Sequence, residues 1–447
     1  MANVIKLRKG LDIKLQGKAE EKTLHLKSNG KFALVPDDFV GVTPKVVVKE
    51  GDKVKAGDAL FVNKLYPEVK FASPVSGIVR EVVRGERRKV LCIKVDSDSQ
   101  QEFTDFGKKD VGSLNGEQVI NALLDAGLFG YINQLPYAVS ANPTVMPKAV
   151  FVSALRDKPL AADFEFEVKG QEQDFQTGLT ALSKIAKTYL GVGVGSALES
   201  MKDVEVNVFD GPCPAGNVGV QVNHLDPVNK GEVVWTIGDP TVVLFIGRLF
   251  NTGKVDLHRL VALCGSEVQK PMYVDMLVGE ELSTLVSNSY DASHSVRIIN
   301  GNVLTGTPTT KDGYLGAHAS EITIIPEGND ADEMLGWILP RFKQFSVNRS
   351  YFSWLCGKKD YALDARIKGG ERHMIMSGEY DKVLPMDIYG EYLIKAIISG
   401  DIDRQEALGI YEVAPEDFAL AEFVDSSKLE LQRIVREGLN ILRKENA

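Results

Sequence analysis

The sequence predicts a multidomain α/β protein made of four successive units. Its 447 residues exceed what a single hydrophobic core usually organises. The hydrophobic pattern also changes along the chain: short alternating runs come first, then continuous apolar runs separated by amphipathic stretches, then amphipathic stretches alone. We therefore expect an all-β unit, a parallel α/β unit, a small mixed unit and a helical unit, in that order.

Residues 1–110 are predicted to form the all-β unit. Gly-Asp pairs at 51–52 and 57–58 predict two turns, a Ser-Pro turn follows at 73–77, and a strand is expected at 77–83. This order of turns is typical of biotinyl/lipoyl (barrel-sandwich) carrier domains, which place a modifiable lysine at a hairpin tip. Pro67 stands near that position here. The sequence therefore predicts the carrier scaffold without its attachment lysine.

Residues 111–265 are predicted to form a Rossmann-like parallel α/β domain. The run 149–155 is apolar throughout, as expected for a strand that is buried on both faces. Asp239 and Pro240 provide start signals for a buried helix that extends to residue 250. The remaining expected elements are helices at 113–128 and 171–187 and strands at 204–209, 232–237 and 260–263.

Two further units are predicted to complete the chain. In 266–330, a short helical pattern at 276–289 precedes a strand-like run at 296–307, which favours a β-grasp (SLBB-like) arrangement. In 331–447 the pattern is mainly helical. The clearest helices are expected at 386–398 and 427–443, and the second carries an apolar stripe made of Leu429, Leu431, Ile434, Val435, Leu439 and Leu442.

Composition and charge argue against several classes of protein. The net charge of −9 is the opposite of what a nucleic-acid-binding surface needs, so no nucleic-acid partner is expected. Cys92, Cys213, Cys264 and Cys356 form no CxxC pair, so neither an iron–sulfur cluster nor a zinc site has support. A membrane span needs about 20 apolar residues, and the chain has no such run and no signal-peptide core. We expect a cytoplasmic protein.

The segment 128–139 is the first candidate site, because it combines aromatic rings with amide side chains. A quinone requires an apolar groove for its tail and one or two hydrogen-bond donors for its carbonyl oxygens. The alternative is that this segment packs between domains. The candidate residues are Phe129, Tyr131, Asn133, Gln134 and Tyr137.

The segment 210–216 is the second candidate, because it directly follows an expected strand. Open α/β sheets bind ligands beyond the carboxyl ends of their strands. Its two prolines make a rigid elbow that is poorly suited to holding phosphate, and a purely structural elbow is the alternative. The candidate residues are Asp210, Gly211, Pro212 and Gly216.

Two other features do not support a site. The loop at 191–196 departs from the dinucleotide fingerprint, because the sixth position from Gly191 is Ser196. We expect a structural turn there. The histidines His224, His258, His294 and His318 have no metal-type spacing and are expected in turns, on the surface or in a satisfied core.

Several motifs occur together in one family. They are RKGLDIKLQG (8–17), the carrier-like segment, DGPCPAG (210–216), VLTGT (303–307), FSVNRS (345–350) and VLPMDI (383–388). In this order they resemble the A-subunit of the bacterial sodium-translocating NADH:quinone oxidoreductase over essentially the whole chain. The elbow departs from the family, which often has His where Cys213 stands.

The resemblance implies a peripheral protein at the cytoplasmic face of the bacterial inner membrane, which binds membrane quinone and helps to assemble the complex. It implies that this protein has no tightly bound redox cofactor. NADH, flavins and an iron–sulfur cluster would be held by other subunits, and the membrane-embedded B-subunit would be the first partner. The isolated chain is not expected to be active, and sodium pumping would belong to its partners.

Three alternatives remain open. The chain could be a purely structural scaffold of that complex, or an NADH- or FMN-binding electron-transfer protein like the C-subunit of the Rnf complex. The Rnf protein has cluster-binding cysteines, and here Ala421 and Asp425 occupy the matching positions, which disfavours this alternative. A biotin or lipoyl carrier is the third alternative, and Pro67 at the tip argues against it.

Overall fold

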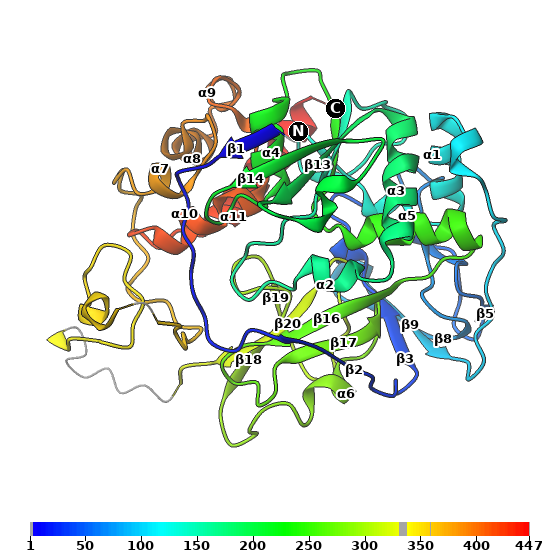
Figure 1. Ribbon diagram of the computed structural model, residues 1–447, viewed down its shortest axis with the longest axis horizontal. Coiled ribbons are helices and arrows are strands. Elements are labelled where there is room, and N and C mark those ends of the chain that lie inside the picture. The colour runs from blue at the N-terminus through cyan, green and yellow to red at the C-terminus, as the bar shows by residue number, and fades with distance from the viewer. Residues whose placement is uncertain (1–2, 330–337, 358, 447) are drawn as a thin grey trace.

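The computed structural model describes residues 3–329, 338–357 and 359–446 (Figure 1). Within these ranges the strands form four sheets. Two small sheets make the N-terminal β unit, and a seven-stranded and a six-stranded sheet make the centre of the molecule. The C-terminal helices pack beside the seven-stranded sheet (Figure 1).

The N-terminal β unit consists of two antiparallel sheets that face one another, as expected for a barrel-sandwich domain. Phe61 and Phe71, on the paired strands β6 and β7 of one sheet, stack with ring centroids 4.4 Å apart and pack against Phe39. Gly51 and Gly57 have φ of +90° and +100°, so both predicted turns use the left-handed conformation that favours glycine. The strands are β3 (Lys31–Leu34), β4 (Pro44–Val46), β5 (Lys53–Val54), β6 (Ala59–Asn63), β7 (Lys70–Ala72), β8 (Gly77–Arg84) and β9 (Val90–Ser97).

The seven-stranded sheet has the order β1-β14-β13-β12-β15-β10-β11. Its central strands β14, β13, β12 and β15 are parallel, and the chain order reverses between β12 and β15. This is the switch point of a Rossmann-like sheet, where ligands usually bind. The strands are β1 (Asn3–Lys6), β10 (Asn133–Leu135), β11 (Val139–Ser140), β12 (Ala149–Ser153), β13 (Lys187–Gly193), β14 (Glu205–Asp210) and β15 (Val234–Ile237).

Helices cover both faces of this sheet. Val150 and Val152 of β12 pack in the cluster that contains α1, α3 and α5, whereas Ala149 and Phe151 pack against α4. β12 is therefore buried on both faces, as its continuous apolar run predicts. The helices are α1 (Gly116–Asp125), α2 (Phe164–Val168), α3 (Glu172–Ile185), α4 (Val218–Leu225) and α5 (Thr241–Thr252).

The six-stranded sheet has the order β19-β18-β20-β16-β17-β2. The expectation that 260–263 continues the parallel sheet is wrong, because β16 pairs with β17 and β20 instead. An apolar run predicts a buried strand but does not specify its partner. The helix expected at 276–289 is reduced to α6 (Ser283–Val286). The strands are β2 (Glu20–Leu24), β16 (His258–Cys264), β17 (Met272–Leu277), β18 (Val296–Asn300), β19 (Thr307–Thr309) and β20 (Glu321–Pro326).

Residues 3–24, here called the N-terminal strap, connect the two large sheets. β1 pairs with β14 in one sheet and β2 pairs with β17 in the other. Figure 1 shows the strap as the dark blue trace that runs between these two edges. The strap therefore lies outside the β unit, although the sequence pattern assigns it to that unit. The division of the chain into domains at 1–110, 111–265, 266–330 and 331–447 stays a prediction.

The C-terminal helices begin at Tyr380. Residues 338–357 and 359–379 are mostly irregular, and residues 331–337 of the expected helical unit lie outside the described ranges. The apolar stripe predicted for the last helix is confirmed, since Leu431, Val435, Leu439 and Leu442 are fully buried. The helices are α7 (Tyr380–Val383), α8 (Gly390–Ser399), α9 (Ile402–Ala407), α10 (Ala419–Val424) and α11 (Leu431–Glu445).

Candidate functional site

A cavity of about 460 Å³ lies beyond the carboxyl ends of β12 and β15, at the switch point of the parallel sheet. The six-stranded sheet closes one side with residues 300–307 and 316–321, and the C-terminal part contributes 414–416 and two residues of α11. The β unit adds Asp38 and Val40. Every part of the chain therefore supplies a wall, and we call this space the junction cavity.

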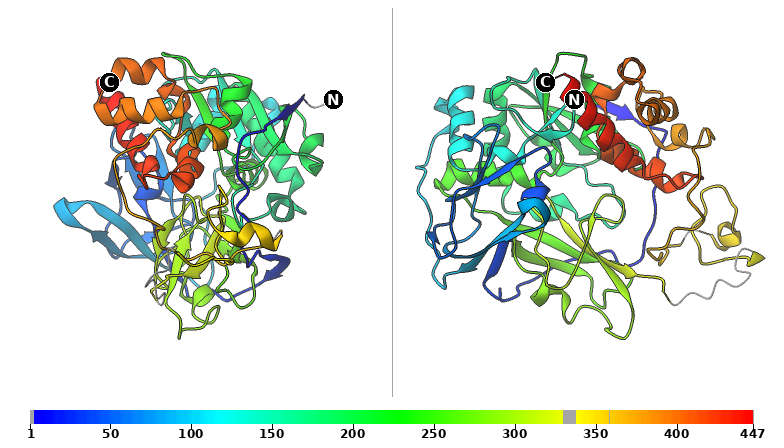
Figure 2. Two further views of the ribbon diagram at one scale, coloured as in Figure 1. Left: turned by 90° about the vertical axis from the view of Figure 1, so that its left-hand side faces the viewer. Right: turned by 180° about the vertical axis from the view of Figure 1, so that it is seen from behind.

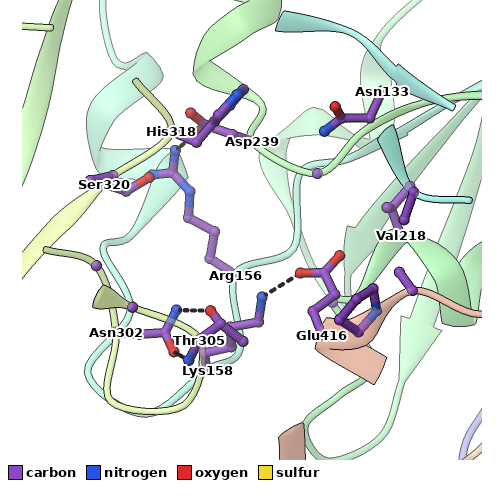
Figure 3. A pocket seen from close by; sticks show the side chains of 18 of the residues that line it. Asn133, Arg156, Lys158, Val218, Asp239, Asn302, Thr305, His318, Ser320 and Glu416 are labelled. Atoms are coloured by element: carbon purple, nitrogen blue, oxygen red, sulfur yellow. Dashed lines mark hydrogen bonds and ion pairs between the residues drawn. The ribbon is translucent and has the colours of Figure 1, made fainter. Parts of the chain in front are cut away.

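Arg156 organises the charges on one wall of the junction cavity (Figure 3). Its guanidinium donates to Glu167 and to Asp239, both at 2.8 Å. Arg259, from β16, lies 3.0 Å from the other oxygen of Asp239. Burial opposes ionisation of Asp239, but Arg259 and Arg156 outweigh burial and lower its pKa to about 2. A charged network thus joins the two large sheets.

Lys158 forms a second neutralised pair in the junction cavity. Its ammonium lies 2.9 Å from a carboxylate oxygen of Glu416, as the dashed line in Figure 3 shows. Burial opposes the charged form of Lys158, but Glu416 outweighs burial and raises the pKa of this lysine. Asp157, between these two basic residues, accepts a hydrogen bond from the Gly216 amide at 2.8 Å, and burial raises its pKa.

Tyr131 and His318 line the junction cavity on the same side as Asp239, and Phe39 packs against both rings. The ring of Tyr131 lies 5.5 Å from that of His318 and 5.0 Å from that of Phe39. Burial lowers the pKa of His318, so its imidazole is held in the neutral form. Burial also raises the pKa of the neighbouring Asp38 to about 6. The buried Tyr131 hydroxyl has no hydrogen-bond partner among the residues that the structure describes.

The structure divides the residues predicted in 128–139. Tyr131 and Asn133 line the junction cavity. Phe129 is instead fully buried against Trp235, with ring centroids 5.2 Å apart. The Gln134 side chain accepts a hydrogen bond from the Asn142 amide at 2.8 Å. Tyr137 turns away, and its hydroxyl accepts a hydrogen bond from Asn446 at 3.2 Å.

The elbow 210–216 meets the junction cavity only at its end, through Gly216. The Asp210 carbonyl oxygen accepts a hydrogen bond from the Leu7 amide at 2.8 Å. A side chain at Gly211 would collide with Leu7, and one at Gly10 would collide with Pro212. Asp210, Gly211 and Pro212 therefore serve to hold the N-terminal strap against the sheet.

Most of the polar residues of the junction cavity were missed by the sequence reasoning. Arg156 and Lys158 lie within three residues of the end of the apolar run 149–155, and Asp239 lies two residues after β15. Polar residues after two parallel strands are a usable signal, but Asp239 is also a plausible helix start and was interpreted only in that way. His318 and Glu416 come from distant parts of the chain and carry no local signal.

Three other observations bear on function. Gly191 and Gly193 lie within β13, and a side chain at 191 would collide with Gln221 of α4, so these glycines allow close packing. Among the described residues, no group of three or more His, Cys, Asp or Glu side chains is arranged to hold a metal ion. In the same residues, no helix has the length and apolar character required to cross a bilayer.

Models of three domains of one family match the chain. The NqrA N-terminal barrel-sandwich hybrid domain matches residues 5–98, and the NqrA second alpha/beta domain matches 114–255. The NQRA C-terminal domain, an SLBB model, matches 260–311. These matches confirm the predicted succession of a barrel-sandwich, an α/β and an SLBB-like unit.

Curated relatives align over the whole chain. Proteins of Yersinia pestis bv. Antiqua (strain Angola), Serratia proteamaculans (strain 568) and Neisseria meningitidis serogroup B are 34%, 35% and 33% identical to it. Each alignment covers 99% of this chain and 100% of the relative. All three relatives are named as the A-subunit of the Na(+)-translocating NADH-quinone reductase.

Proposed function

The chain belongs to the family of the A-subunit of the Na(+)-translocating NADH-quinone reductase, and from this membership we propose that it binds the quinone headgroup in the junction cavity. It acts as one subunit of a multisubunit enzyme. Its own contribution is to bind and orient the quinone, while the electrons arrive from other subunits.

The observation that carries this proposal is the Tyr131 hydroxyl. It is a buried donor at the cavity wall without a partner in the described chain. Leaving such a group unpaired costs about 1–3 kcal/mol, which a ligand carbonyl oxygen would recover. A quinone has two carbonyl oxygens and no donor of its own, so it complements this group.

The charge distribution of the junction cavity also supports a neutral ligand. Arg156 is compensated by two carboxylates and Lys158 by Glu416. These two cations are already neutralised, which weakens the attraction of their side of the cavity for a polyanion such as a dinucleotide. Apolar residues such as Leu135 and Val218 complete the lining and suit an aromatic ring.

The test is a calorimetric titration of the purified chain with a short-tailed quinone. The wild-type chain is expected to bind one equivalent. Tyr131→Phe removes only the hydroxyl, and it is expected to weaken binding about fivefold, because one neutral hydrogen bond contributes about 1 kcal/mol.

Tyr137→Phe is the matched control, because this hydroxyl bonds to Asn446 and does not line the cavity. Its quinone affinity should equal that of the wild type. An equal loss in both variants, or no saturable binding by the wild type, would rule out this site and favour the scaffold alternative. Saturable binding of NADH or FMN instead would favour the electron-transfer alternative.

We also propose that the chain associates with the membrane-embedded B-subunit on the cytoplasmic face of the inner membrane and helps to assemble the complex. The names of the relatives support membership of such a complex. Flavins, the iron–sulfur cluster and the NADH site are assigned to other subunits. In this chain, the glycines that come nearest to a dinucleotide loop serve close packing, Gly191 against Gln221 of α4 and Gly193 against Leu155.

A further inference from the structure

A second surface of unusual composition lies in the C-terminal part of the chain. Residues 338–355 expose seven large apolar side chains, each between 40% and 60% accessible to solvent. We call this region the 338–355 surface, and its apolar members are Ile338, Leu339, Phe342, Val347, Phe352, Trp354 and Leu355. Exposed apolar side chains gathered in this way mark a site of interaction.

Contacts within the segment hold these side chains in one local unit. The rings of Phe342 and Phe352 lie 6.3 Å apart, and the Phe352 amide donates to the Pro340 carbonyl oxygen at 3.0 Å. Lys359 also donates to the carbonyl oxygen of Phe342. Figures 1 and 2 show the segment, in yellow, projecting from the body of the molecule at the end opposite to α1.

The charge of this surface differs from that of the rest of the chain. Residues 338–357 contain Arg341, Lys343 and Arg349 and no Asp or Glu, whereas the whole chain has a net charge of −9. Arg349 lies over the ring of Trp354, 5.3 Å from its centroid, and Arg341 lies 5.6 Å from that of Tyr351. Two cations of this segment thus lie over aromatic rings of the same segment.

We propose that the 338–355 surface binds a bilayer that contains anionic lipids. Tryptophan and other apolar side chains are favoured at the depth of the lipid headgroups. Arginine and lysine beside them are attracted to anionic headgroups, whereas the acidic remainder of the chain is repelled. The proposal is independent of the junction cavity and of quinone.

A second cavity, of about 540 Å³, adjoins this surface. Its walls include Tyr351, which directly precedes Phe352, and Leu304. Leu304 precedes Thr305, which lines the junction cavity, and the Gln432 side chain of α11 donates to the Leu304 carbonyl oxygen at 3.0 Å. The second cavity therefore adjoins both the 338–355 surface and the segment 302–305 that helps to line the junction cavity.

The test is sedimentation of the full chain with lipid vesicles. We expect binding to vesicles of phosphatidylethanolamine and phosphatidylglycerol, weakened by salt, and little binding to phosphatidylcholine alone. The double variant Lys343→Glu with Arg349→Glu is expected to lose at least about fivefold in affinity for each cation removed. Phe352→Ser with Leu355→Ser is expected to lose binding as well, since it removes apolar anchors.

Matched controls use equally exposed residues elsewhere, namely Leu65→Ser with Val194→Ser and Lys27→Glu with Lys45→Glu. They should bind as the wild type does, and unchanged thermal unfolding would show that every variant is folded. Three results would overturn the proposal: no binding to anionic vesicles, equal binding to phosphatidylcholine, or equal losses in controls and variants. Retention by detergent-solubilised membrane subunits without vesicle binding would also overturn it, by identifying a protein interface.

Discussion

Arg156 compensates two buried carboxylates at once, so its removal should be costly. Arg156→Met keeps much of the side-chain volume but leaves Glu167 and Asp239 without their shared cation. We expect the free energy of unfolding to fall by about 3–5 kcal/mol, measured by urea denaturation at neutral pH. Arg433→Met is the control, because Arg433 pairs with two glutamates at the surface. A change there above about 1 kcal/mol would contradict this reasoning.

Asp38 is expected to make stability depend on pH. Burial raises its pKa from 3.8 to about 6, so the folded chain holds this proton more tightly than the unfolded chain. Folding takes up the proton between these two values, and raising the pH through this window lowers the free energy of unfolding. Asp38→Asn removes the effect.

The difference in unfolding free energy between Asp38→Asn and the wild type should therefore shift in favour of the variant as pH rises through the window. The shift should reach about 3 kcal/mol. It can be followed by urea denaturation at several pH values. Asp37→Asn is the control, because Asp37 is the exposed neighbour of Asp38. An equal dependence of its unfolding free energy on pH would contradict the assignment of the effect to Asp38.

At the scale of single residues, the sequence could indicate which residue types suit a site, but it could not indicate how their side chains are oriented. Tyr131 and Tyr137 both look suited to a quinone, yet only Tyr131 lines the junction cavity. The backbone turns between them, and Tyr137 has a φ of +82°. An apolar or aromatic pattern alone could not predict such a turn, so it could not predict that Tyr131 and Asn133 line the junction cavity while Phe129, Gln134 and Tyr137 do not.

At the scale of elements, α3 and α5 pack closely because each helix has a glycine where it contacts the other. A side chain at Gly247 of α5 would overlap the Asp174 carbonyl oxygen of α3, and one at Gly178 of α3 would overlap Val243 of α5. Gly247→Ala should therefore lower the melting temperature. We expect the free energy of unfolding to fall by about 1–3 kcal/mol, because the cost of the overlap exceeds the gain of about 1 kcal/mol from the higher helix propensity of alanine.

Circular dichroism during heating measures this effect. Gly370→Ala is the control, because a side chain there meets no described atom within 4 Å. A stabilised Gly247→Ala variant would mean that helix propensity, rather than the distance between the two helices, decides the outcome.

Elements with a long, regular pattern were predicted well from the sequence. The expected helix at 171–187 corresponds to Glu172–Ile185, and its predicted apolar face is buried. The expected helix at 276–289 is limited to Ser283–Val286, because β17 extends to Leu277, Gly279 has a φ of +79°, and Glu280 and Glu281 form bridges to Phe32 and Tyr314. Short amphipathic runs fit a strand as well as a helix, so pairing with β16 and β2 decides the result.

At the scale of the whole molecule, the family resemblance inferred from motifs is confirmed by relatives that align along the entire chain. The sheet to which a strand belongs was harder to predict. β1 lies in the seven-stranded sheet and β2 in the six-stranded sheet, outside the β unit, and β16 lies in the six-stranded sheet rather than in the parallel sheet. The junction cavity was hardest, because Asp38, Arg156, His318 and Glu416 meet there from four distant parts of the chain. The spacing of residues in a single sequence does not indicate that such distant residues lie close together in the fold.

The N-terminal strap has a consequence for biosynthesis. β2 ends at Leu24, and its partner β17 begins 248 positions later, at Met272. Translation proceeds at about 5–20 residues per second, so the emerging β2 strand waits on the order of 10–50 s for its partner. During that time β1 also lacks β14. The strap is thus synthesised well before the strands with which it pairs, and during this interval a chaperone or a neighbouring nascent chain has access to unpaired strands.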